Sequence, residues 1–315
     1  MSADLHVDRI EIEDRASWLA LRAGDVTASD VAAVLGVDDY RTPARVYAEK
    51  TGAIAPPDDN TLMRRGRWFE AAAVAALGEE RPTWDVKRAG VYLRAPALGI
   101  GATPDAVATR PDRAGFGIVQ IKVVAEPVFR EKWCGGDIER PPLGYQLQTI
   151  TEGRLAKADW TCVAALIVGT FSAELKLFDV DHGHEPSWTR IVEGVNLFRD
   201  YIAAGQMPPL LADRDAETVK ALFRREDDAE PPKNLPADLL STLERREDLR
   251  AQIKDASEAV EAIDTTIKAA LGNSSVGLLA PYRVGWKVEP RKSYTVAASE
   301  PRVLRITKPK GRARG

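Results

Sequence analysis

Hydrophobic and polar positions follow two different periods over the first 210 residues. Apolar residues that recur every three or four positions predict helices, and runs that alternate or stay apolar predict strands. The predicted helices cover residues 14–21, 30–35, 42–50, 67–77, 143–152 and 186–204. The predicted strands cover residues 90–93, 99–108, 118–124, 161–168 and 174–180. This mixture predicts an α/β (α+β) fold with a central mixed β-sheet flanked by helices.

The pattern changes after residue 210. Residues 211–237 are charged and contain prolines, which is typical of a linker. Beyond them, a narrow apolar stripe typical of a coiled-coil seam is formed by Leu249, Ile253, Ala256, Val260, Ile263, Ile267 and Ala270. A single helix of this kind is not stable alone, so we expect it to pack on the core, a partner chain or a second helix. The predicted domains are a core over 1–210, a linker over 211–237, and a third segment over 238–315. The third segment is predicted to contain a long helix, a small β tail with short strands between 282 and 305, and a basic C-terminus.

Composition narrows the class of protein. With 315 residues, of which 44% are hydrophobic and 29% charged, the chain excludes a collagen, a mucin and a mostly disordered protein. No apolar run approaches the roughly 18 residues of a membrane span, and the first residues lack the apolar stretch of a signal peptide. Cys134 and Cys162 are too few for a disulfide framework or a four-cysteine metal site. We therefore expect a cytoplasmic protein with no membrane partner.

The distribution of charge leaves a nucleic-acid enzyme open. The net charge of −3 argues against a protein that coats nucleic acid non-specifically. Positive charge is nevertheless concentrated at Arg64, Arg65 and Arg67, just before a predicted helix, and in the tail 301–315, which carries basic residues and no acidic one. We expect this tail either to fray in solvent or to contact a phosphate backbone.

Four residues have the types and spacing of a phosphodiester-cleaving site. Glu70 has apolar neighbours on its helix, so its carboxylate needs either a metal ion or an ion pair with an arginine. Asp105 lies near the end of one predicted strand, and Gln120 and Lys122 share one face of the next. If these strands pair as a hairpin, Asp105 lies beside Gln120 and Lys122. Carboxylate and amide oxygens can hold Mg²⁺, and a lysine can stabilise an attacking hydroxide.

Together, the segments resemble the YqaJ-type viral recombinase family, which is related to the phage lambda exonuclease and belongs to the PD-(D/E)XK nuclease superfamily. The segments that carry the resemblance are residues 22–30, 65–70, 101–105, 120–122, 141–148 and 165–169. The resemblance spans residues 15–210 and implies a PD-(D/E)XK nuclease core. The long helix with a small β tail also fits phage members of this family.

The resemblance implies a role for each matching residue. The implied ligands of Mg²⁺, or of Mn²⁺ as the alternative ion, are Glu70, Asp105, Gln120 and the backbone carbonyl of Ile121. Lys122 would orient and activate water. The implied contacts to DNA or to a terminal 5′ phosphate are Arg22, Thr27, Ser29, Arg65, Tyr145, Gln146 and Gln148. A hydroxyl at a helix N-terminus next to an arginine suits a phosphate, although Ser29 can equally be an ordinary N-cap.

The activity that the resemblance implies is a Mg²⁺-dependent 5′-to-3′ exonuclease on linear double-stranded DNA, which resects one strand for phage-type recombination. The implied partners are a single-strand annealing protein and further copies of the chain in a trimeric ring, in the cytoplasm of a phage-infected or prophage-bearing bacterial cell. The family usually carries Glu or Asp where Gln120 stands, which should lower the affinity for metal. Two alternatives therefore stay open: a degenerate nuclease that binds DNA or acts in assembly, and a restriction-type endonuclease on the same core.

Overall fold

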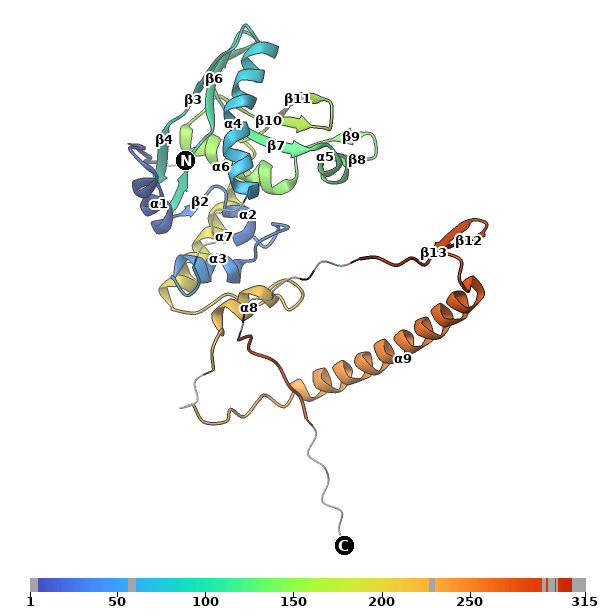
Figure 1. Ribbon diagram of the computed structural model, residues 1–315. Coiled ribbons are helices and arrows are strands. Elements are labelled where there is room, and N and C mark those ends of the chain that lie inside the picture. The colour runs from blue at the N-terminus through green and yellow to red at the C-terminus, as the bar shows by residue number, and fades with distance from the viewer. Residues whose placement is uncertain are drawn as a thin grey trace. The chain divides into compact units, whose positions relative to one another are not determined.

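The computed structural model describes residues 5–55, 61–226, 230–290, 293, 298 and 300–307. Internal contacts divide the chain into two compact units, Met1–Phe223 and Arg224–Gly315, which are described separately (Figure 1). The helices of the first unit are α1 (Arg15–Gly24), α2 (Val31–Val34), α3 (Pro43–Lys50), α4 (Thr61–Glu80), α5 (Glu126–Lys132), α6 (Leu143–Ala156), α7 (Glu185–Ala203) and α8 (Ala216–Leu222). Its strands are β1 (Asp8–Glu11), β2 (Val26–Thr27), β3 (Asp85–Arg88), β4 (Val91–Ala95), β5 (Ile100–Ala102), β6 (Ala106–Arg110), β7 (Arg113–Ala125), β8 (Cys134–Gly135), β9 (Ile138–Glu139), β10 (Trp160–Val168) and β11 (Ala173–Val180).

A five-stranded sheet with the order β11-β10-β7-β6-β3 forms the centre of the first unit. β7 is parallel to β10 and antiparallel to β6, so the sheet is mixed, as the sequence predicts. Successive side chains of a strand point to opposite faces. Val119 and Ile121 of β7 pack in an apolar cluster with α4, whereas Gln120 and Lys122 form hydrogen bonds to α6. The polar positions of β7 are therefore gathered beneath one helix.

Gly117 of β7 leaves room for the Trp160 side chain of β10. Trp160 of β10 lies opposite Gly117 of β7. A Cβ atom at Gly117 would lie 2.2 Å from the Trp160 ring, and Trp160 is only 2% exposed. A larger residue would have to displace the tryptophan, so glycine is required at this position.

A four-stranded sheet with the order β1-β4-β5-β2 lies beside α1 and α2. β2 and β5 are parallel, which places Thr27 opposite Gly101. A Cβ atom at Gly101 would lie 1.8 Å from the hydroxyl oxygen of Tyr92, so this position also excludes a side chain. The predicted single strand over 99–108 is wrong, because β5 ends at Ala102 and β6 begins in the other sheet. Pro104 has no N–H to continue a ladder, and the chain crosses between the sheets at this point.

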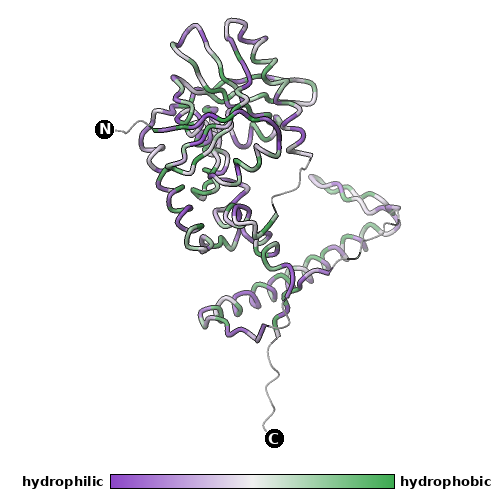
Figure 2. Tube along the Cα trace, turned by 90° about the vertical axis from the view of Figure 1, so that its left-hand side faces the viewer, coloured by the Kyte–Doolittle hydropathy of each residue, from purple (hydrophilic) through white to green (hydrophobic). Residues whose placement is uncertain are grey.

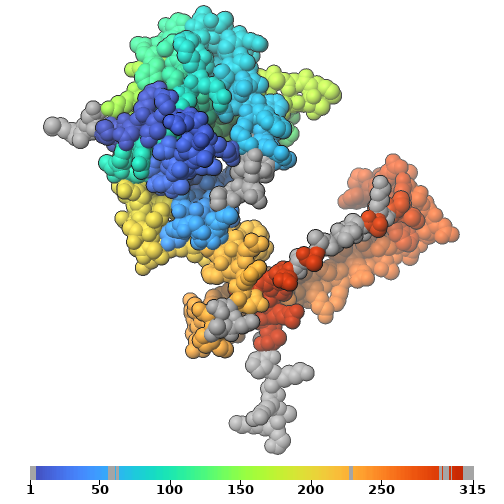
Figure 3. All heavy atoms as spheres, turned by 60° about the vertical axis from the view of Figure 1, so that its left-hand side comes forward, coloured from blue at the N-terminus to red at the C-terminus, as the bar shows by residue number. Residues whose placement is uncertain are grey.

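The helices of the first unit cover both sheets. α2, α6 and α7 share an apolar cluster with the four-stranded sheet, and α4 shares another with the five-stranded sheet. In Figure 3 the blue surface of the N-terminal helices lies against the yellow surface of α7, in agreement with the contacts of α7 with α2 and α3. α1, α2, α3, α6 and α7 confirm five predicted helices. No helix in the described ranges is long and apolar enough to cross a membrane.

Two predicted boundaries differ from the structure. α4 begins at Thr61, so Arg64, Arg65 and Arg67 lie within the helix and not before it. The first unit also extends past residue 210 into the predicted linker. There, the buried carboxylate of Asp215 accepts hydrogen bonds from the Thr42 hydroxyl and from the Leu211 backbone N–H. These bonds hold α8 and the turn before it on the first unit.

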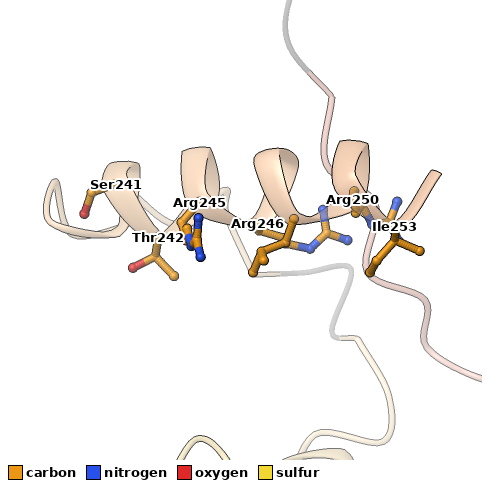
Figure 4. Close-up of a pocket in the computed structure, with 7 residues that line it drawn as sticks. Ser241, Thr242, Arg245, Arg246, Arg250 and Ile253 are labelled. Atoms are coloured by element: carbon orange, nitrogen blue, oxygen red, sulfur yellow. The ribbon is translucent and has the colours of Figure 1, made fainter. Parts of the chain in front are cut away.

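The second unit contains α9 (Leu239–Leu271) and the hairpin of β12 (Val276–Leu279) and β13 (Tyr282–Gly285). The described residues between 286 and 307 include no strand, so the predicted strand toward 305 is absent there, and residues 308–315 of the basic tail lie outside the described residues. Apolar and polar segments alternate along α9 in Figure 2, and none of its residues is buried. A surface hollow on this helix is lined by Ser241, Thr242, Arg245, Arg246, Leu249, Arg250 and Ile253 (Figure 4). The packing partner of the apolar stripe stays a prediction.

Candidate active site

Asp105 lies against the polar face of β7. Because β6 begins directly after it and pairs with β7, the register brings its carboxylate to Gln120 and Ile121. The Oδ2 atom accepts hydrogen bonds from the Gln120 side-chain amide and, at 2.7 Å, from the Ile121 backbone N–H. No described residue donates a hydrogen bond to Oδ1. The structure thus brings together the predicted pair of Asp105 and Gln120, with one carboxylate oxygen left for a ligand.

Gln148 of α6 connects the polar residues of β7. Its Oε1 atom accepts a hydrogen bond from Lys122 Nζ at 3.0 Å. Its Nε2 atom donates to Gln120 Oε1 at 3.0 Å and to Glu152 Oε1 at 2.9 Å. Lys122 Nζ also lies 4.7 Å from the centre of the Tyr145 ring. Tyr145, Gln148 and Glu152 share one face of α6 because residues three and four apart are neighbours on a helix.

Glu152 is a residue of this site that the sequence analysis missed. It is 1% exposed, and its Oε2 atom has no hydrogen-bond partner within the described residues. Burial raises the pKa of Glu152, and the negative charge of Asp105 raises it further. Burial likewise raises the pKa of Asp105, although the Lys122 charge and the Ile121 N–H oppose this shift. An acid four residues after Gln148 on the same helix is the signal that can identify Glu152 from sequence.

Glu70 and Arg65 lie on α4. The Glu70 carboxylate forms an ion pair with Arg88 of β3 at 2.9 Å, which is the ion-pair alternative of the sequence analysis with a different arginine. The charge of Glu70 still raises the pKa of Asp105, so the two carboxylates are within electrostatic reach. The Arg65 guanidinium lies over the Phe69 ring of the same helix, 5.4 Å from its centre. Metal binding by Glu70 and DNA binding by Arg65 stay predictions.

Arg22, Thr27 and Ser29 form a hydroxyl-and-guanidinium cluster at the end of α1. The Arg22 guanidinium donates to Ser29 Oγ at 3.0 Å and to Thr27 Oγ1 at 3.3 Å. It also lies 4.6 Å from the centre of the Trp18 ring, one helical turn earlier. Ser29 is not a helix cap, because Asp30 occupies that position and α2 is only four residues long. The cluster keeps an arginine and two hydroxyls together without relying on a helix N-terminus.

Buried charges hold this cluster in place. Burial alone would raise the pKa of Asp30, but Lys50 and Arg41 hold it well below its usual range. The Asp30 carboxylate in turn accepts a hydrogen bond from Thr27 Oγ1 at 2.7 Å. Burial lowers the pKa of Arg22, which the charges of Asp30 and, more weakly, Glu152 oppose. The cluster is therefore electrostatically connected to the polar residues of α6.

Gln146 faces a different part of the surface from Gln148. Its Nε2 atom donates to the Pro141 carbonyl at 2.7 Å. A hollow of about 460 Å³ is lined by Lys132, Trp133, Cys134, Gly135, Arg140, Pro141, Pro142, Leu143 and Gln146. The Trp133 ring lies 5.7 Å from the Tyr145 ring, which links this hollow to the site of Lys122. The predicted DNA contacts of α6 thus divide between the two places.

The donor set suits one ion that prefers oxygen ligands. Among the described residues, no three His, Cys, Asp or Glu side chains gather as a metal cluster. Asp105 Oδ1, the Ile121 carbonyl and the Gln120 amide supply oxygen atoms on adjacent positions. The Gln120 side chain donates its Nε2 hydrogen to Asp105, and its Oε1 atom faces Gln148. The side-chain amide must therefore rotate before Oε1 can reach a metal ion held by Asp105. The oxygen-only set and the orphaned Glu152 oxygen fit Mg²⁺ better than Zn²⁺.

Residues 17–154 match the sequence profile of the YqaJ-like viral recombinase domain. Over this segment the chain is similar to that family. The segment contains the whole polar site, from Arg22 on α1 to Glu152 on α6. The resemblance noted from the motifs is thereby confirmed for this part of the chain. No curated protein shows a significant match to the full sequence.

Several solved structures are also similar to this chain. An alkaline exonuclease (LHK-Exo) from Laribacter hongkongensis has a TM-score of 0.47 and 21% identity over 65% of this chain and 100% of its own. The complex of LHK-Exo with dAMP has a TM-score of 0.49 and 23% identity, over 61% and 94%. A phage-related exonuclease from Haemophilus somnus has a TM-score of 0.39 and 13% identity, over 57% and 96%.

Proposed function

We propose that this protein is a Mg²⁺-dependent exonuclease that digests linear double-stranded DNA from 5′ ends. The observation that carries the proposal is the cluster of Asp105, Gln120, Lys122 and Gln148 inside the segment that is similar to the YqaJ-like viral recombinase domain. Asp105 and Lys122 occupy the positions of the acid and the lysine in the PD-(D/E)XK pattern. The pairing of β6 with β7 supports this assignment, because it places the acid beside the strand that carries the lysine.

Each residue of the site has a chemical task in phosphodiester hydrolysis. Asp105, Gln120 and the Ile121 carbonyl would hold Mg²⁺, which when bound polarises the phosphate. Lys122 would position water and offset negative charge as it develops on the phosphorus centre. Gln148 and the Tyr145 ring hold the ammonium group of Lys122, which limits its motion before substrate binds. Such fixed orientation is a main source of catalytic rate.

The Arg22 cluster supports attack from a 5′ end. A guanidinium with two hydroxyls can bind a terminal phosphate through charge-assisted hydrogen bonds. Thr27 and Gly101 lie opposite each other on β2 and β5, and the chain continues from Gly101 to Asp105. A terminal phosphate held at Arg22 would therefore lie close to the bond to be cut. Resection of this kind would supply single strands to an annealing protein, and a trimeric ring around DNA would make digestion processive.

A DNA-binding protein without catalysis is the second candidate. Gln120 supplies no negative charge, and Glu70 is engaged by Arg88. Both features weaken a metal site that normally relies on carboxylates. Measuring the rate of the wild type and of Gln120→Glu against Mg²⁺ and Mn²⁺ concentration separates the candidates. We expect Gln120→Glu to cleave at lower metal concentration, whereas no cleavage by either protein at any concentration would favour the binder.

Digestion of one linear duplex with a 5′ phosphate tests the exonuclease itself. The reactions contain Mg²⁺ or EDTA, and a closed circular duplex is the topological control. We expect the linear duplex alone to shorten, only with Mg²⁺, and Lys122→Ala to lose roughly a hundredfold or more of the rate. Lys87→Ala is the matched control, because Lys87 is an exposed lysine of β3 paired with Asp85. Cleavage of the circle would identify an endonuclease, and labelling each end in turn gives the polarity.

A further inference from the structure

Glu152 is a buried carboxylate for which the folded structure gives no stabilising role. Its side chain is 1% exposed and forms no ion pair within the described residues. Only Oε1 is hydrogen-bonded, to the Gln148 amide, while Oε2 has no partner among the residues that the structure describes. A glutamine would make the same bond without the cost of burying an ionisable group. The ionisable side chain at this position therefore indicates a functional role, because packing alone does not require a carboxylate.

The position of Glu152 beside Gln148 indicates that it acts on the polar site of β7. Gln148 Nε2 donates to both Glu152 Oε1 and Gln120 Oε1, so a single amide group joins the acid of α6 to the amide of β7. The family usually carries Glu or Asp at the position of Gln120, so this site lacks one negative charge there. Glu152 is the carboxyl group one hydrogen-bonded residue away, and the negative charge of Asp105 raises its pKa. The carboxyl group missing from the strand is thus present on the facing helix, where a bound cation would favour its ionised form.

We infer that Glu152 is a positioning residue that replaces, from α6, the negative charge that Gln120 does not supply on β7. Its Oε1 atom keeps the Gln148 amide in place when the Gln120 oxygen turns toward the metal, and in its ionised form Glu152 makes the site of Asp105 attractive to a divalent cation. This inference rests on the proposed function, because it assumes that the site binds Mg²⁺. It differs from the sequence analysis, in which Glu70 alone completed the acidic ligands.

Titration calorimetry of the full chain with Mg²⁺ and Mn²⁺ tests the inference without measuring cleavage. The proteins are the wild type, Glu152→Gln, Gln120→Glu and the double variant Gln120→Glu/Glu152→Gln. We expect Glu152→Gln to weaken binding roughly ten- to a hundredfold, as for residues that support metal ligands. The double variant should bind within a few-fold of the wild type, because the charge returns to the strand. Asp215→Asn is the matched control, since Asp215 is an equally buried acid outside the site.

The outcomes separate this inference from the proposed function. A wild type that binds and cleaves, with a folded Glu152→Gln that binds equally well, would overturn the role of Glu152 alone. A folded double variant that binds no better than Glu152→Gln would also overturn it, because restored charge should restore binding. A wild type that neither binds these ions nor cleaves DNA would overturn the proposed function instead. Thermal unfolding of each variant checks folding, and Glu152→Gln should not melt below the wild type at alkaline pH.

Discussion

Replacing Glu152 by glutamine should change how the stability of the metal-free protein depends on pH. Burial and the charge of Asp105 raise the pKa of Glu152 from 4.5 to about 8, against the opposing effects of Gln148, Lys122 and Arg22. Between these two pH values, the native state keeps a proton on Glu152 that the unfolded state has released. Stability therefore falls as pH rises through this window, since the unfolded state binds fewer protons. Glu152→Gln removes this contribution.

The size of the effect follows from the same values. One proton corresponds to about 1.4 kcal/mol per pH unit, so the window from 4.5 to about 8 contributes up to about 5 kcal/mol. The amide left at position 152 costs a roughly constant 1–3 kcal/mol if its nitrogen is unpaired. This offset moves the whole curve of the variant but leaves its slope unchanged. The pH dependence of the difference between variant and wild type therefore reports the Glu152 carboxyl group together with its interaction with Asp105.

Urea unfolding in EDTA at pH 5, 7 and 9 measures this difference. EDTA removes divalent ions, which would otherwise stabilise the ionised form of the site. We expect the free energy of unfolding of Glu152→Gln to rise relative to the wild type with each step in pH. Two curves that stay parallel from pH 5 to 9 would refute the reasoning, because a carboxyl buried in its neutral form cannot titrate without this cost.

Three further substitutions test other parts of the structure. Arg22→Ala removes a guanidinium that is hydrogen-bonded to two hydroxyls. In steady-state digestion, the KM for 5′-phosphorylated duplex should rise roughly ten- to a hundredfold, whereas the KM for 5′-hydroxyl duplex should change little. Gly117→Ala should destabilise the protein by about 1–3 kcal/mol in urea unfolding, because its Cβ meets the Trp160 ring; equal stability would contradict this packing. Asp215→Asn weakens the hydrogen bond from Thr42, so it should lower the free energy of unfolding by about 1–3 kcal/mol. It should also make residues 211–223 sensitive to limited proteolysis, without changing metal binding.

The sequence alone was sufficient to predict the strand that carries the site. Alternation along 118–124 places Gln120 and Lys122 on one face, and the structure has them on the face toward α6. The pairing of Asp105 with Gln120 was predicted correctly, because a short connection between two antiparallel strands fixes the register. The α6 helix and the α/β class were also predicted correctly, because both depend on local periodicity.

Other features depend on contacts that no local pattern contains. The break at Pro104 assigns β5 and β6 to different sheets, which an uninterrupted apolar run does not indicate. Glu70 pairs with Arg88, which is distant in sequence and comes near only when β3 packs beside α4. The burial of Glu152 depends on α6 lying between the two sheets, so its missing partner is visible only in three dimensions.

The chain between β5 and β6 joins the neighbourhood of the Arg22 cluster to Asp105 through a short stretch of backbone. The Gly101 carbonyl is held by the Ala28 N–H at 2.7 Å, beside Thr27, and Asp105 follows four residues later. Trp18 fixes the middle of this stretch through a 3.0 Å hydrogen bond to Thr103. Four residues span at most roughly 14 Å even when fully extended. Under the proposed function, in which a strand end binds at Arg22 and is cut at Asp105, this fixed length of backbone would set the step length along DNA, and an inserted residue would change the size of the released product.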